Sequence, residues 1–122
     1  MKIKMKPQEI VSNLEGLLKV IRSEEEYCKE KAAAKFPPLV AMAIAKNAKA
    51  LEGEVTIIQE QQQKNQSIAE KRKIDLKDVQ EQKDLLQTEI FVEIHEVSED
   101  DLLKSKDLSS SDFCNLLFML KQ

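Results

Sequence analysis

Residues that interrupt helices are scarce in this chain. Its 122 residues include two glycines and three prolines, far fewer than the roughly 12% that these two residue types make up in average proteins. Antiparallel sandwiches and barrels need both at many turns, so the composition excludes a mainly β fold. Gly16 and Gly53 stand too far apart to form a P-loop or a dinucleotide-binding fingerprint, which excludes the nucleotide folds built on glycine-rich loops.

Residue types that carry chemistry are equally few. The chain has one histidine (His95), two cysteines (Cys28 and Cys114) and no tryptophan. Nucleophilic catalysis needs a nucleophile, a base and an orienting group, and zinc sites or redox pairs need closely spaced cysteines. We therefore expect no enzyme, no metal and no other cofactor. The cysteines lie in helical sequence, and we expect buried free thiols in a reducing cytoplasm.

The chain also lacks a long apolar run and a strong charge of one sign. No stretch of about 18 apolar residues is present, so neither a transmembrane helix nor a signal peptide fits, and we expect no membrane partner. The 19 Lys and Arg residues against 22 Asp and Glu give a net charge of −3. This balance disfavours nucleic acid as a partner, because nucleic-acid-binding proteins carry a basic face. The local charge runs are typical of solvated surface.

What the sequence does contain is regular hydrophobic periodicity. Ile10, Leu14, Leu17 and Ile21 recur at helical spacing, and Pro37-Pro38 ends that pattern. We predict a mainly α fold: a long helical hairpin, further short helices and a small two-stranded β element, in one domain over residues 1–122. The expected order is strand 1–6, helix 7–35, helix 38–66, helix 75–89, strand 90–97 and short helices 98–122. Whether the Gln-rich stretch 59–66 is helix or linker stays open.

Three caps and one strand pairing follow from the same pattern. Asp75 with Asp78, Ser98 with Asp101 and Ser109 with Asp112 each resemble a helix start flanked by apolar residues. The two strands are expected to pair, with the lysines of the first facing glutamates of the second, Glu93 and Glu96.

The start of the second long helix is apolar on almost every side, which indicates burial on every side. In so small a protein a second copy is expected to cover part of it, through Leu39, Val40, Met42 and Ala43. Polar groups then break the apolar surface and are candidates for contact with a protein or an anionic, nucleotide-like ligand, with aromatic residues available for stacking. The candidate contact residues are Lys46, Asn47, Lys49, Phe36, Tyr27, Phe91 and His95. The plainer interpretation is that this helix simply emerges into water.

At this segment the chain resembles a family of small uncharacterised proteins from phages and prophages of low-GC Gram-positive bacteria. An opening Met-Lys-Ile-Lys strand precedes an amphipathic helix. A Pro-x-x-Val-Ala-x-x-Ile-Ala-Lys-Asn-x-x-x-Leu-Glu block then ends at Glu52, and residues 92–97 lead into an acidic helix and a Leu-Ser cap at 108–112. The Gln-rich residues 61–73 depart from the family's more charged continuation. The resemblance implies a phage origin and the cytoplasm of an infected or lysogenic bacterial host, and it carries no activity.

Two functions fit these observations. The first is a non-enzymatic, oligomeric binding protein that inhibits host defence, either by sequestering a nucleotide-type signal or by blocking a host protein. The alternative is a structural or assembly factor of the virion that uses the helical hairpin as a docking surface. Both rest on class-level analogy with other small helical phage proteins.

Overall fold

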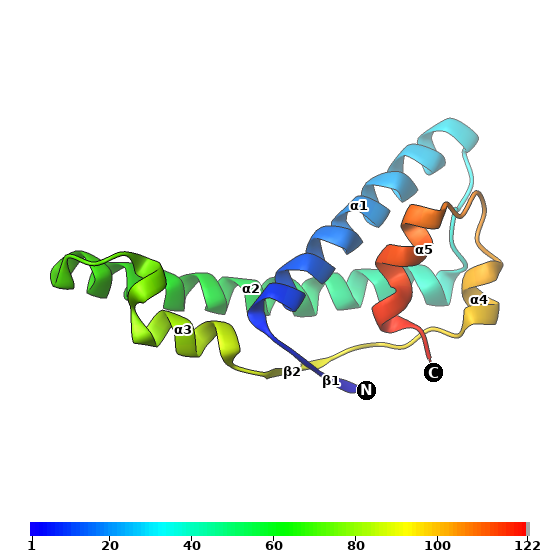
Figure 1. Cartoon of the computed structure of the whole chain (residues 1–122). Helices are drawn as coiled ribbons and strands as arrows, with labels where there is room; N and C mark the ends of the chain where they lie inside the picture. The colour runs from blue at the N-terminus through cyan, green and yellow to red at the C-terminus, as the bar shows by residue number, and fades with distance from the viewer. Residues whose placement is uncertain (122) are drawn as a thin grey trace.

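Two long helices that form a V dominate the computed structural model, which describes residues 1–121. Helix α1 (Pro7–Lys31) and helix α2 (Pro38–Arg72) lie close together near the start of α1 and diverge toward the connection at 32–37 (Figure 1). Because α2 is the longer helix, its second half extends past α1. The fold is mainly α with a minor β element, as predicted.

A two-stranded antiparallel sheet joins the beginning of the chain to its last third. Strand β1 (Lys2–Met5) pairs with β2 (Ile90–Glu93), and Lys2 stands opposite Glu93. Lys2 faces Glu93 in the register as predicted, but the predicted ion pairs are wrong: the Glu93 carboxylate lies 3.1 Å from the terminal amino group, and Lys4 pairs with Glu89.

The C-terminal third fills the opening of the V. Helix α4 (Glu99–Leu103) lies near the start of α2, and α5 (Ser110–Leu116), followed by the 3₁₀ turn η2 (Leu117–Met119), lies between α1 and α2 (Figure 1). Both expected caps of these helices are present, since the Ser98 and Ser109 hydroxyls accept hydrogen bonds from the backbone N–H groups of Asp101 and Asp112. The core side chains with almost no exposure come from β1, the two long helices, the segment after β2 and the C-terminal helices: Met5, Ile10, Leu17, Val20, Val40, Leu51, Ile94, Leu102, Leu116 and Met119.

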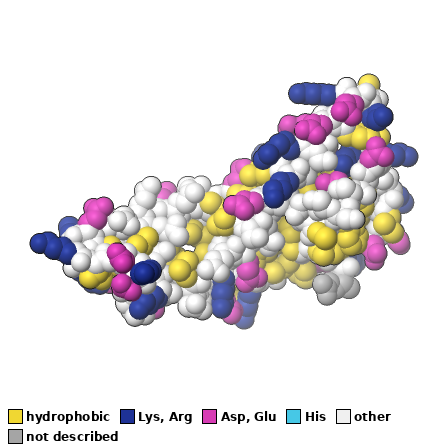
Figure 2. Space-filling view, turned by 45° about the horizontal axis from the view of Figure 1, so that its top comes forward, with side chains coloured by type: hydrophobic (Ala, Val, Ile, Leu, Met, Phe, Trp, Pro, Cys, Tyr) yellow, Lys and Arg dark blue, Asp and Glu magenta, His cyan; other side chains and the backbone are white. Residues whose placement is uncertain are grey.

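We call residues 53–87 the arm and residues 1–52 with 88–121 the body. The arm comprises the second half of α2, the 3₁₀ turn η1 (Leu76–Asp78) and helix α3 (Gln80–Gln87). Its buried side chains are Ile58, Asn65, Ala69, Val79 and Gln82. Figure 2 shows a patch of hydrophobic side chains on the body, and charged side chains of both signs toward the end of the arm.

Several predicted bounds need correction. Helix α1 ends at Lys31 rather than 35, because Ala32 adopts a left-handed conformation (φ 49°) in which its N–H bonds the Cys28 carbonyl. Helix α2 continues through the Gln-rich stretch to Arg72 rather than ending at 66. Strand β2 ends at Glu93 rather than 97, and the first strand is confined to residues 2–5.

The predicted cap at Asp75 is also wrong. Neither the start of η1 nor that of α3 has a side-chain cap, and α3 begins at Gln80 after Val79 instead of at 75. The 3₁₀ turn takes the place of the expected first helical turn. Within the described residues, no helix is both long and apolar enough to cross a membrane.

Candidate binding surfaces

The side chain of Asn47 fixes the segment after β2 against the middle of α2. Its Oδ1 accepts a hydrogen bond from the His95 backbone N–H at 2.7 Å, and its Nδ2 donates to the His95 carbonyl at 3.0 Å. Nδ2 also lies 3.4 Å from Met119 Sδ. The residue has no solvent exposure. Asn47 therefore belongs to the core and is not available to a ligand, which corrects the prediction that it contacts one.

This anchoring places His95 beside the first turns of α2, where a hollow of about 220 Å³ opens. We call this region the α2-start surface. It consists of Leu39, Met42, Ala43, Lys46, His95, Glu96, Val97, Ser98 and Asp101. Leu39 and Met42 are 69% and 53% exposed, and Lys46 and His95 are also exposed. The structure thus brings three residues of the predicted interface, Leu39, Met42 and Ala43, together with two predicted contact residues, Lys46 and His95.

Other residues predicted to take part in binding are buried or lie outside this surface. Val40 and Ala43 are buried in the chain's own core, so the predicted interface loses half of its apolar residues to internal packing. Phe36 is 3% exposed and cannot stack on a ligand, which corrects a second prediction. Tyr27 is half-buried on α1, and Lys49 is exposed on α2 outside the hollow. Phe91 is exposed on β2, with the Lys4 ammonium 5.3 Å from the centre of its ring.

A buried ion pair ties the connection between α1 and α2 to α5. Lys35 Nζ lies 2.8 Å from Asp112 Oδ2 and donates to the Ser23 hydroxyl at 2.7 Å. Both charged side chains are less than a tenth exposed. Nearby, burial raises the pKa of the Glu24 carboxyl, and the Glu25 carboxylate adds to that shift while Lys35 opposes it. The sequence analysis identified Asp112 as a cap but did not identify Lys35, because no periodic pattern marks a buried charge in a connecting segment.

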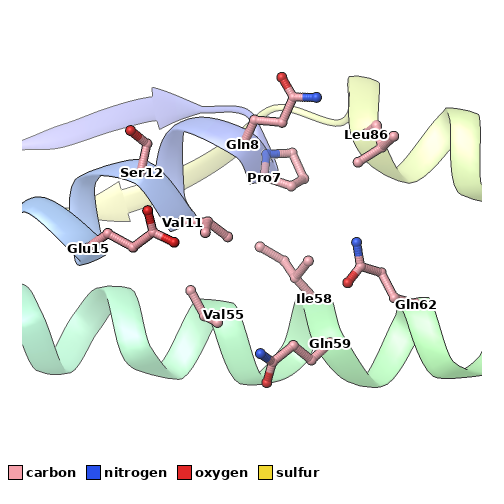
Figure 3. Close-up of a pocket in the computed structure, with 10 residues that line it drawn as sticks. All are labelled: Pro7, Gln8, Val11, Ser12, Glu15, Val55, Ile58, Gln59, Gln62 and Leu86. Atoms are coloured by element: carbon pink, nitrogen blue, oxygen red, sulfur yellow. The ribbon is translucent and has the colours of Figure 1, made fainter.

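A larger hollow of about 480 Å³ lies where the start of α1, the middle of α2 and the end of α3 meet (Figure 3). We call it the three-helix groove. Val11, Val55, Ile58 and Leu86 give it an apolar floor, and its rim carries amide side chains. The sequence analysis missed it, since residues that line a groove and residues that face a neighbouring helix share the same helical spacing.

Both cysteines are exposed, which corrects the expectation that Cys28 and Cys114 are buried. Within residues 1–121, no group of three or more His, Cys, Asp or Glu side chains is arranged to hold a metal ion. Comparison with protein-family models, curated proteins and solved structures found no match to this chain.

Proposed function

We propose that this protein is a non-enzymatic, phage-encoded binding protein that works as a homodimer in the bacterial cytoplasm and inhibits host defence by blocking a host protein. The resemblance to phage and prophage proteins supports the setting. The observation that carries the binding role is the α2-start surface, where two large apolar side chains remain exposed beside charged groups of both signs. Exposed apolar residues rimmed by polar ones are typical of interaction sites.

The charges of this surface favour a second copy of the same chain as its occupant. Leu39, Met42 and Lys46 follow one another at spacings of three and four, so they form a stripe along one face of α2. If two copies pack antiparallel about Met42, the Lys46 stem of each copy covers Leu39 of the other. Its ammonium then approaches Asp101 and Glu96, which border the same hollow. The contact is isologous and satisfies the same pair of charges twice.

Two exposed apolar side chains per copy are few for a stable interface, which buries about 800 Å² on each partner. We therefore expect weak self-association, with a dissociation constant in the micromolar range or above.

Between the two modes of inhibition, the structure favours blocking of a protein. A nucleotide ligand needs donors for its phosphates and an aromatic face for its base. Asn47 already makes internal hydrogen bonds, and Phe36 lies in the core. Lys46 remains as the cation lining the hollow, next to two carboxylates.

Sedimentation velocity tests the homodimer. The wild type should show a concentration-dependent shift from monomer to dimer that the variant Leu39→Ser/Met42→Ser lacks. Ile57→Ser is the matched control, because Ile57 is 54% exposed on the arm and should leave dimerisation unchanged. Lys46→Glu should weaken the dimer, and Asp101→Lys in the same chain should restore it. A strictly monomeric wild type at high concentration would refute the homodimer.

Inhibition of host defence needs a separate measurement. Expression of the protein in a bacterium that restricts a phage should raise the plating efficiency of that phage. Plating efficiency that stays unchanged across defence-carrying hosts would contradict the proposed inhibition without bearing on dimerisation.

A further inference from the structure

We infer that the three-helix groove binds a short amphipathic helix of a partner protein, one that presents apolar side chains and a lysine or arginine. This inference rests on the proposed function in taking the partner to be the blocked protein. It concerns a site separate from the α2-start surface, since the two hollows share no lining residue.

The groove combines an apolar floor with polar side chains toward its two ends. Figure 3 shows the side chains of Val11 and Ile58 directed toward each other across the space between α1 and α2, with Val55 beside them. Glu15 lies at one end and Gln62 toward the other. A volume of about 480 Å³ with an apolar floor and few polar groups is within the range of ligand-binding clefts.

The charge of the groove favours an occupant that carries a positive charge. Of the described side chains that line the groove, Glu15 is the one that carries a formal charge, and it is exposed. The other polar linings are neutral, mainly the amides of Gln8, Gln59 and Gln62. An anionic ligand would meet a carboxylate and no cation there. An occupant with a basic side chain would pair with Glu15, and the amides would serve as donors or acceptors for its neutral polar groups.

The backbone of the groove indicates that the occupant is helical. Every residue that lines it belongs to a helix, and outside the first and last turns the N–H and C=O groups of a helix pair with one another. The groove therefore offers no strand edge to which an extended peptide could add. Recognition has to use side chains, as when an amphipathic helix packs into an apolar groove.

The length of the groove fits two helical turns. Along α1 it runs from Pro7 to Glu15, and along α2 from Val55 to Gln62. At a rise of 1.5 Å per residue, each wall is roughly 10–12 Å long. Two turns of a partner helix present apolar residues at i and i+4 over that length, with the basic residue directed toward the Glu15 end.

The test is selection from a displayed library of randomised 12-residue peptides against the intact protein. The wild type should enrich peptides with apolar residues at i and i+4 and a Lys or Arg near one end. Glu15→Lys should reverse the preference, so that the enriched peptides carry Asp or Glu instead. Glu26→Lys, an exposed change toward the other end of α1, should leave the basic preference intact. For one enriched peptide, Glu15→Gln should weaken binding roughly two- to fivefold, as expected for one exposed ion pair.

Several outcomes would overturn the inference. These are no enrichment, enrichment without a charge preference, a preference that Glu15→Lys does not change, or peptides with central prolines, which would indicate an extended ligand. A loss of self-association in Glu15→Lys would assign the groove to a second copy instead. The Leu39→Ser/Met42→Ser variant separates the two proposals, because it should lose the dimer and still select basic amphipathic peptides.

Discussion

The body and the arm share one continuous helix, α2, yet different interactions stabilise each region. In the body, α2 buries aliphatic side chains against α1, β2 and the C-terminal segment. In the arm, two of the five buried side chains are the amides of Asn65 and Gln82, which hydrogen-bond each other at 2.9 Å. Apolar burial is non-directional and strong in proportion to area, whereas a single amide pair contributes about 1 kcal/mol net. The arm should therefore open before the body unfolds.

The two regions also differ in whether their buried side-chain pair is charged or neutral. The body buries a charged pair, Lys35 with Asp112, as well as the amide of Asn47, whereas the buried polar side chains of the arm form a neutral pair, Asn65 with Gln82. A buried charge without its partner costs far more than a buried amide without its partner. Removing one member of each pair therefore tests the comparison directly. The free energy of unfolding should fall further when the pair in the body is broken.

The largest effect is expected for Lys35→Met. The substitution leaves Asp112 buried in the first turn of α5 without a cation, and we expect a loss of about 3–5 kcal/mol of unfolding free energy, measured by urea denaturation. Adding Asp112→Asn should recover most of the loss, since the neutral amide keeps a polar group at the cap. A single variant that lost less than about 1 kcal/mol would mean that water reaches this site and that the pair behaves as a surface ion pair.

A smaller and local effect is expected for Gln82→Leu in the arm. It leaves the Asn65 amide without its partner and should cost about 1–3 kcal/mol. The double variant Asn65→Leu/Gln82→Leu should return close to wild-type stability, because no orphaned amide remains. Amide hydrogen exchange should speed up in α3 and stay unchanged in α5. Equal acceleration in both helices would show that arm and body unfold together and would refute their separation.

The two glycines offer a matched comparison of packing. A Cβ at Gly16 would lie 3.0 Å from Asn115 Oδ1 on α5, whereas a Cβ at Gly53 would meet nothing within 4 Å. Gly53→Ala should stabilise the protein by about 0.5–1 kcal/mol through helix propensity alone. Gly16→Ala should gain less or lose stability, because Asn115 must move. Thermal unfolding of the two variants decides this, and equal gains would show that α5 packs loosely on α1.

Much of the fold could be predicted from the spacing of apolar residues, but only where apolar residues occupy the positions that face the core. The seam of Leu51, Val55 and Ile58 continues without a break at Gln62 and Asn65. Amides at core positions do not register as a hydrophobic pattern, so the end of α2 was placed too early and the Gln-rich stretch stayed undecided. The partner that makes burial of Asn65 acceptable, Gln82, is 17 residues away.

The candidate site shows the same limit. The sequence analysis named Leu39 and Met42 as interface residues and Lys46 as a contact residue, and the structure brings His95 to them. Sequence spacing could not distinguish Asn47 from the exposed Lys46. The Asn47 side chain is buried and forms hydrogen bonds with the His95 backbone. Neighbouring residues on a helix point to different sides, and which side meets the rest of the chain depends on tertiary contacts.

The smallest expected effect concerns two carboxyls, one in each region, whose pKa values shift in opposite directions. Burial, with the Glu25 carboxylate nearby, raises the pKa of Glu24 in the body above its ordinary 4.5. A hydrogen bond from its own backbone N–H, together with bonds from Arg72, lowers the pKa of Glu81 in the arm. Glu24 therefore destabilises the fold when ionised, and that penalty disappears as pH falls through its raised folded value. Glu81 stabilises the fold above pH 4.5, and this contribution is lost as pH falls through its lowered folded value.

Glu24→Gln and Glu81→Gln should consequently have opposite signs at neutral pH. The first should raise the melting temperature relative to wild type and the second should lower it. Both differences should shrink toward zero in acid, the Glu24 difference first, because its folded pKa lies higher. NMR titration of the two carboxyls gives the order independently. A shift of the melting temperature in the same direction for both variants would contradict this prediction. It would show that the body and the arm do not have opposite effects on the stability of an ionised carboxylate.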